Sequence, residues 1–210
     1  MKNTLQKLTL SIVFTICYLT INAQFGYGLT VTNDIYQRYT NPKDNTGQYR
    51  GSGSAILNFA VGPKIWIGGQ NMSLSLEAQA GIGLLSLAVV DYKGLGAAYF
   101  PIMAKLNFKG LSGLDKEGRQ GWYIGGGLQY FRTELYGLNN RAKRLGVERS
   151  IYPSYIGQFG YGFGLSGFVG SGFIRAGYHP DTKANFMALG IQADFNKPML
   201  KKIANTASQL

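Results

Sequence analysis

The chain of 210 residues has little cysteine, little histidine and little charge. Its one cysteine, Cys17, lies near the N-terminus, so a disulfide within the chain and a cysteine-based metal site are excluded. Charged residues make up 15% of the chain, against roughly 25% in a typical soluble domain. With 13% aromatic residues, the chain is nevertheless too rich in ring side chains to be disordered.

Long apolar runs are also missing beyond the first 23 residues. A membrane-spanning helix needs roughly 20 apolar residues, so a bundle of such helices is excluded. The 30 glycines amount to about 14% of the chain, twice the usual ~7%. They do not recur at every third position, as collagen requires. One domain of mainly β structure remains.

Residues 1–23 have the parts of a secretory signal peptide. Two lysines near the start form a basic region, residues 8–19 form an apolar core, and Ala23 is the small residue at the cleavage position. The apolar core is too short and too rich in threonine to span a membrane well. We therefore predict cleavage before Gln24, which removes both lysines and lowers the formal charge from +11 to +9.

Beyond Gln24, apolar residues alternate with polar or small ones, which is the period of a β-strand with two different faces. In residues 73–84 the even positions are leucine, alanine or isoleucine, and the odd positions are serine, glutamate, glutamine or glycine. We expect a β-bulge at Gly62–Pro63, where the alternation breaks, and an irregularity at Pro101, which has no backbone N–H. The eight predicted strands are 24–32, 53–67, 72–91, 97–109, 121–136, 152–165, 168–179 and 185–196.

The connections between these strands differ in length at the two ends of the predicted sheet. If the first strand runs outward, the long polar loops 33–52 and 137–151 share one end, and the short turns 68–71 and 166–167 share the other. Long outer loops and short inner turns are typical of bacterial outer-membrane barrels. The connection at 110–120 is longer than this rule expects.

A soluble lipocalin-like barrel shows the same alternation but turns its apolar face inward. Two features favour a membrane barrel instead. The polar face consists largely of glycine, serine, glutamine and asparagine, which suit a narrow, wet interior. The apolar face carries aromatic residues toward both ends, as expected at two membrane interfaces. These residues are Phe25, Phe108, Trp122, Phe168 and Phe195 at the inner end, and Tyr130, Tyr136, Tyr155 and Tyr178 at the outer end.

With a signal peptide, eight alternating strands and a closing strand that ends at Phe195, the chain resembles the OmpA/OmpX-like class of small bacterial outer-membrane proteins. The resemblance covers residues 24–196 and rests on no diagnostic motif. It implies an all-β fold, an eight-stranded antiparallel up-and-down transmembrane β-barrel in the outer membrane. Residues 1–23 would then be the cleaved signal peptide, and 197–210 a short basic periplasmic tail.

The resemblance also implies contact with outer-membrane lipid and with the barrel assembly machinery. In this class the assembly machinery commonly reads an aromatic residue at the end of the closing strand. Here a tail follows Phe195, which departs from that pattern and leaves the role of Phe195 as an insertion signal open.

Four charged residues fall on the predicted inner face, and their charges sum to zero. Because an unpaired charge in a narrow interior is costly, we expect them to pair and plug the lumen, with a gated polar path as the alternative. They are Glu77, Lys105, Arg175 and Asp194. A narrow channel or a binder of small apolar ligands would need interior space. Large side chains occupy that space in the predicted barrel, namely Tyr99, Tyr123, Phe131 and Phe173.

The predicted outer loop 137–151 carries a cluster of basic residues. Facing outward, these side chains would neutralise phosphates of lipopolysaccharide or an acidic partner, and the plainer interpretation is a solvated loop. The cluster consists of Arg141, Lys143, Arg144 and Arg149. Nucleic acid is not expected as a partner, because the basic residues are dispersed and the chain is exported.

His179 is the only histidine, and a hairpin centred on 166–167 places Ser154 beside it. With Asp181 or Glu148 they would form the Ser-His-acid set of an outer-leaflet lipid or ester hydrolase, although no catalytic motif surrounds them. We therefore predict a protein with a structural or surface-interaction role and no enzymatic activity, with no cofactor and no metal site.

Overall fold

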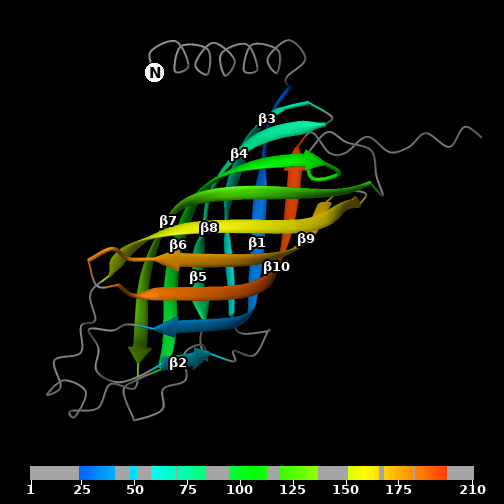
Figure 1. Cartoon of the computed structure of the whole chain (residues 1–210). Helices are drawn as coiled ribbons and strands as arrows, with labels where there is room; N and C mark the ends of the chain where they lie inside the picture. Colours follow the sequence, from blue (N-terminus) through cyan, green and yellow to red (C-terminus); the bar gives the residue numbers. More distant parts are fainter. Residues whose placement is uncertain are drawn as a thin grey trace, which may run out of the picture.

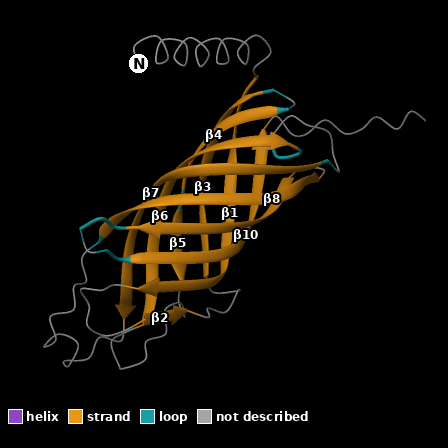
Figure 2. Cartoon of the chain, viewed as in Figure 1, coloured by secondary structure: helices purple, strands orange, loops and turns teal. Residues whose placement is uncertain are grey.

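The structure is a computed structural model that describes residues 24–40, 48–51, 58–69, 71–83, 95–112, 119–136, 151–165, 168–181 and 183–197. The described chain consists of strands joined by short connections (Figure 2). The strands are β1 (Gln24–Thr40), β2 (Gln48–Gly51), β3 (Asn58–Gly68), β4 (Met72–Ala78), β5 (Ala80–Gly83), β6 (Leu95–Lys109), β7 (Gln120–Tyr136), β8 (Tyr152–Leu165), β9 (Phe168–Tyr178) and β10 (Asn185–Lys197). In these ranges no helix has the length and apolarity needed to cross a membrane.

The strands form one closed antiparallel sheet, an up-and-down barrel (Figure 1). β4 and β5 are two parts of one strand, and β2 pairs with β1 on the same side as β3, so the wall has eight strands. β1 pairs with β10 on one side and with β3 on the other, which joins the last strand to the first. Closure satisfies the backbone groups of the wall without a free sheet edge. The predicted fold is confirmed.

The two ends of the barrel are named here by their connections. At the turn end, β3 is joined to β4, β6 to β7 and β8 to β9, and β1 begins and β10 ends there (Figure 1). The loop end is the opposite end, where β2 lies. The predicted turn residues 166–167 lie outside the described residues, and on either side of them Leu165 at the end of β8 pairs with Phe168 at the start of β9, as the predicted register requires.

The first strand is longer than predicted, and the loop predicted at 33–52 is wrong in part. β1 continues to Thr40, and β2 pairs with its last residues. A β-bulge between Asp34 and Tyr36 leaves Ile35 and Tyr36 both exposed, which breaks the alternation that the prediction followed. The predicted strand ends at 53–57 and 84–91 lie outside the described residues.

The bulge predicted at Gly62–Pro63 is wrong, since β3 pairs with β1 without any shift of register. Pro63 of β3 and Pro101 of β6 lie beside Gln79, the residue between β4 and β5. The pairing of this strand with β3 and with β6 is interrupted there. Gln79 donates its N–H to the carbonyl of Pro101 at 2.9 Å, and Pro101 has no N–H to return. The irregularity expected at Pro101 is therefore a gap in its pairing with this strand.

The outer face of the barrel is apolar and the inner face is polar. Along β4, Leu74 and Leu76 are each 49% exposed, whereas Ser75 and Glu77 are each 1% exposed. The soluble lipocalin-like alternative requires the reverse orientation and is wrong. A barrel in a lipid bilayer has apolar side chains on its outer face, as this closed sheet has. The barrel is therefore of the transmembrane type.

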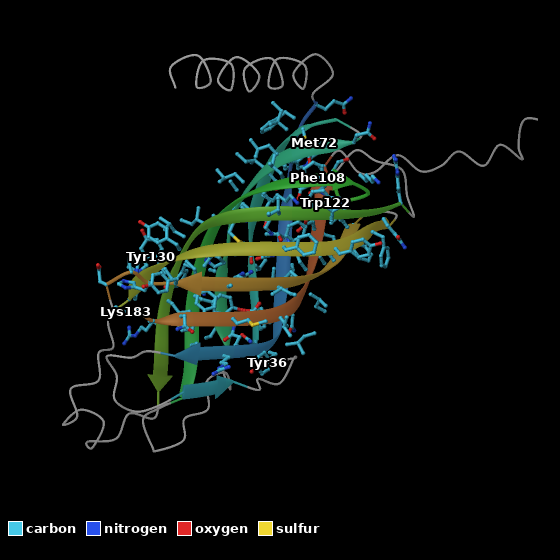
Figure 3. All side chains as sticks on the ribbon, viewed as in Figure 1. Tyr36, Met72, Phe108, Trp122, Tyr130 and Lys183 are labelled. Carbon is cyan, nitrogen blue, oxygen red and sulfur yellow. The ribbon has the colours of Figure 1, made fainter. Side chains whose placement is uncertain are left out.

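Aromatic side chains lie on the outer face toward both ends of the barrel. Figure 3 labels Phe108 and Trp122 near the turn end and Tyr130 toward the loop end. The rings of Phe108 and Trp122 stack with centroids 4.1 Å apart. The side chain of Tyr136 lies outside the described residues. The other predicted belt residues that are exposed are Phe25, Phe195, Tyr155 and Tyr178.

Candidate functional site

The candidate site is the barrel interior, where the inward-facing side chains of the described strands are buried. Two apolar clusters lie toward its two ends. The cluster at the turn end consists of Leu111, Tyr123, Val169 and Phe173. The cluster toward the loop end consists of Ala60, Ala97, Tyr99, Met103, Phe131, Ile156, Ala184 and Phe186. Small interior residues make room for these rings, since a Cβ added at Gly160 would overlap the ring of Tyr123.

Six buried charged residues lie between and beside these clusters, and we call them the charge network. Each is at most 6% exposed, and they carry three positive and three negative formal charges. They are Asp34, Lys64, Glu77, Lys105, Arg175 and Asp194. The formal charges of the network sum to zero. This is expected in a narrow interior surrounded by lipid, because an uncompensated buried charge is strongly destabilising.

The centre of the charge network is a row of alternating charges on β6, β4, β3 and β10. Lys105 Nζ lies 2.7 Å from Glu77 Oε2, and Lys64 Nζ lies 3.3 Å from Glu77 Oε1. Lys64 Nζ also lies 2.6 Å from Asp194 Oδ2. Each lysine therefore contacts a carboxylate, and Glu77 is shared by both.

Gln192 on β10 ties this row together. Its Oε1 accepts a hydrogen bond from Lys105 Nζ at 2.7 Å, and its Nε2 donates to Asp194 Oδ1 at 2.7 Å. Thr30 Oγ1 donates to the same Asp194 oxygen at 2.7 Å. The Gln192 amide therefore bridges Lys105 and Asp194 directly, and its Nε2 also lies 3.4 Å from both carboxylate oxygens of Glu77.

A second chain of polar groups connects Gln192 to Arg175. Gln158 Nε2 donates to Tyr123 Oη at 2.5 Å and lies 3.2 Å from Gln192 Oε1. Arg175 Nε donates to Gln158 Oε1 at 2.7 Å. All of these side chains are buried, and their hydrogen bonds connect Arg175 to the row of charges through Gln158 and Gln192.

Arg175 is held less tightly than the two lysines. Its Nη1 lies 3.8 Å from Asp34 Oδ2, and its guanidinium stacks over Phe173 with Cζ 4.9 Å from the ring centroid. Asp34 Oδ2 also accepts a hydrogen bond from Gln37 at 2.6 Å. Within the described part of the chain, Arg175 Nη2 and Asp34 Oδ1 have no hydrogen-bond partner.

The structure places the four residues predicted for the lumen as follows. Glu77, Lys105 and Asp194 belong to one cluster, whereas Arg175 pairs with Asp34 nearer the loop end. Sequence reasoning missed Lys64 and Asp34. Extending the alternation of β3 through Pro63 would have placed Lys64 on the inner face, but the bulge hid Asp34.

The structure describes the other residues predicted for the interior but not those predicted for the basic loop. The four aromatic residues expected to fill the lumen all face inward and are at most 4% exposed: Tyr99, Tyr123, Phe131 and Phe173. The basic cluster of Arg141, Lys143, Arg144 and Arg149 lies outside the described residues.

Ser154 and His179 are neighbours, as the β8–β9 register requires. Both face the interior, with exposures of 2% and 7%. Asp181 is exposed, and Glu148 lies outside the described residues. Ser154 therefore faces away from the lipid-exposed surface of the barrel. Among the described residues, no group of three or more histidine, cysteine or acidic side chains is placed to hold a metal ion.

No family model matches the chain, and no curated protein matches its sequence. Similar solved structures include the Neisserial surface protein A, at 11% identity and a TM-score of 0.47, over 83% of this chain and 98% of that one. The N-terminal β-barrel domain of Pseudomonas aeruginosa OprF has 14% identity and a TM-score of 0.42, over 83% and 99%. The attachment invasion locus protein Ail of Yersinia pestis has 12% identity and a TM-score of 0.39, over 83% and 97%. All three are small eight-stranded bacterial outer-membrane β-barrels.

Proposed function

We propose that the protein is an outer-membrane β-barrel with a sealed lumen that serves a structural or surface-interaction role rather than transport. The observation that carries this proposal is the filled interior: a neutral network of six buried charges, with an apolar cluster toward each end. An ion entering the lumen would have to separate charge pairs at 2.6 to 2.7 Å and displace packed rings. Neither step is favourable in a low-dielectric interior.

Conductance across a planar lipid bilayer tests the seal. We expect the wild-type protein to give no steady current steps. Replacing Phe131 and Phe186 with alanine, together with Tyr123→Ala, removes rings from both apolar clusters and should produce leak current. Phe159→Ala is the matched control, because that ring is 49% exposed on the outer face. Steady openings of the wild-type protein would instead establish a channel.

The surface-interaction part of the proposal concerns the basic cluster at residues 141–149, which would bind the phosphates of lipopolysaccharide. Replacing Arg141, Lys143, Arg144 and Arg149 with glutamine should lower binding to vesicles that contain lipopolysaccharide. Replacing Lys201 and Lys202 of the tail with glutamine is the control, since these belong to the opposite side of the membrane in the proposed orientation. Equal binding by both variants would argue against this role.

The proposal includes export: residues 1–23 are a cleaved signal peptide, the barrel begins at Gln24 and ends at Lys197, the last residue of β10, and the residues after it are a periplasmic tail. The barrel assembly machinery would insert the chain, with Phe195 as the aromatic residue of the closing strand. Mass spectrometry of protein from the outer-membrane fraction should find Gln24 at the N-terminus. Recovery in a soluble fraction, or with residues 1–23 attached, would contradict it.

A further inference from the structure

The connection between β6 and β7 is the long one that the rule of short inner turns did not expect. It spans residues 110–119, and its first three residues, 110–112, are all buried at the turn end. We call these three residues the plug. Leu111 is 3% exposed and Ser112 is 0% exposed, so the chain does not run over the surface here, as connections usually do.

Leu111 packs among side chains that face the lumen. It forms one apolar cluster with Tyr123 of β7 and with Val169 and Phe173 of β9, each of which is at most 4% exposed. β8 lies between β7 and β9, so the cluster spans three adjacent strands of the wall. The side chain of Leu111 therefore reaches into the mouth of the barrel, although the residue belongs to no strand.

Two glycines make room for the plug. A Cβ added at Gly121 of β7 would lie 2.7 Å from Leu111 N and 2.8 Å from Gly110 N. It would also overlap the carbonyl oxygen of Phe108, so both the plug and the β6–β7 ladder need a glycine here. A Cβ added at Gly110 would overlap the carbonyl of Arg119. These glycines therefore allow the plug to lie against the inner face of β7.

The turn of the plug is closed by local backbone hydrogen bonds. Ser112 N–H donates to the carbonyl of Lys109 at 2.8 Å. Leu111 N–H donates at 3.3 Å to the carbonyl of Phe108, which Figure 3 labels near the turn end. Because the first of these bonds joins the plug to the residue directly before it, the plug can move as a unit about that residue.

Lys109 is the base on which the plug turns. Its φ of 53° lies in the left-handed region, which reverses the direction of the chain. Its own N–H is anchored to the carbonyl of Asn71 at 2.8 Å. Beyond it, the bond from Gly110 N–H to the carbonyl of Gln120 is 3.3 Å long, which is longer than a typical backbone hydrogen bond. The base is therefore fixed more firmly to the wall than the plug is.

The two ends of the lumen are closed in different ways. The loop-end cluster takes most of its side chains from β3, β6, β7, β8 and β10, and the rings of Phe131 and Phe186 stack there with centroids 5.8 Å apart. Opening that end requires rings of the wall itself to move. At the turn end, Leu111 lies outside the strands and completes the cluster, so that end opens without a change in strand pairing.

We propose that residues 110–112 are a hinged plug, with Leu111 as its apolar tip and Lys109 as its hinge. The plug closes the turn end of the lumen, and water and small solutes enter the turn-end cluster when it swings out. The proposal rests on the sealed lumen proposed above, and it adds the element that controls the seal from one side of the membrane.

Thiol labelling in detergent micelles tests the plug, because both ends of the barrel are then open to water. Cys17→Ser removes the natural cysteine, and Val169→Cys places one thiol in the cluster that contains Leu111. A charged methanethiosulfonate reagent should react with it slowly, and Leu111→Ala should raise the rate about tenfold or more. Leu111→Met should restore slow labelling. Leu106→Ala is the matched control, because that leucine is 41% exposed on the outer face of β6.

Ala97→Cys provides a second thiol, in the loop-end cluster, and its labelling should stay slow in Leu111→Ala. Fast labelling at position 169 with Leu111 in place would refute the plug. An unchanged rate there in Leu111→Ala, or an equal rise at both positions, would also refute it, and both results leave the sealed lumen standing. Fast labelling at position 97 with Leu111 in place would refute the sealed lumen itself.

Hydrogen exchange of the unaltered protein tests the hinge without any substitution in the plug. The amide of Ser112 should exchange about tenfold faster, or more, than that of Leu106, because the plug opens while the wall stays paired. Leu106 is a suitable reference, since its strand pairs on both sides at this position. Equal exchange rates would mean that the plug opens only when the wall unfolds, and would overturn the proposal.

Discussion

Glu77→Gln tests whether the buried charges act as one network. The substitution keeps the size of the side chain but removes the negative charge that two lysines share. Lys64 still has Asp194 at 2.6 Å, whereas Lys105 Nζ keeps neutral partners, namely the Gln192 oxygen at 2.7 Å and the Tyr123 ring, whose centroid lies 4.6 Å away. The interior then carries one uncompensated positive charge, located mainly on Lys105.

The expected loss in the free energy of unfolding is about 3 kcal/mol, at the low end of the ~3–5 kcal/mol for breaking a buried pair. It lies at the low end because Gln192 still accepts a hydrogen bond from Lys105. Adding Lys105→Met restores neutrality and should give a coupling energy of about 2 kcal/mol. Adding Lys64→Met instead should recover less, since Lys105 and Asp194 would then be bridged only by Gln192.

Urea unfolding in lipid vesicles, followed by tryptophan fluorescence and by the mobility of unboiled protein on a gel, measures these changes. Asp181→Asn is the control, because an exposed carboxylate should change stability by no more than ~0.5 kcal/mol. The effect of Glu77→Gln should persist at ~1 M salt, since added ions screen exposed charges and not buried ones. If Glu77→Gln costs no more than Asp181→Asn, or adds independently to Lys105→Met, the reasoning is wrong.

Two further predictions concern the two faces of the wall. Gly81→Val should lower stability by roughly 1–3 kcal/mol, because its Cβ would lie 2.5 Å from the ring of Tyr99; Gly157→Val, with open space beside it, should change stability by no more than ~0.5 kcal/mol. Equal unfolding midpoints would contradict the packed interior. Brominated lipid chains should quench Trp122, which is 38% exposed, and spare Trp66, which is 2% exposed. Quenching should therefore disappear in Trp122→Phe and persist in Trp66→Phe. The reverse result would contradict the assignment of the Trp122 face to lipid.

Much of the wall could be predicted from local pattern. The strand at 152–165 is predicted to the residue, and the turn at 166–167 gives the β8–β9 register correctly. These features depend on neighbouring residues, because side-chain alternation and turn position are properties of a short stretch of chain. The faces of residues 73–83 follow from the same rule.

The errors arise where the alternation breaks. The bulge at Asp34 ended the first predicted strand too early, so a buried aspartate was assigned to a loop. Pro63 concealed the inward position of Lys64 in the same way, although the register there is unbroken. A prediction based on strict alternation cannot locate an inserted residue. One extra residue moves every later side chain of the strand to the opposite face.

The alternation of residue types is enough to assign a lipid face and an interior face to each strand. The mean hydropathy of −0.04 averages these two opposite surfaces. Which buried charges meet depends on how the strands close into the barrel. Lys105 reaches Gln192 across 87 residues of sequence, from β6 to β10, because the stagger of the closed barrel brings them to the same height. That stagger is fixed when β10 pairs with β1, and no local stretch of chain encodes it.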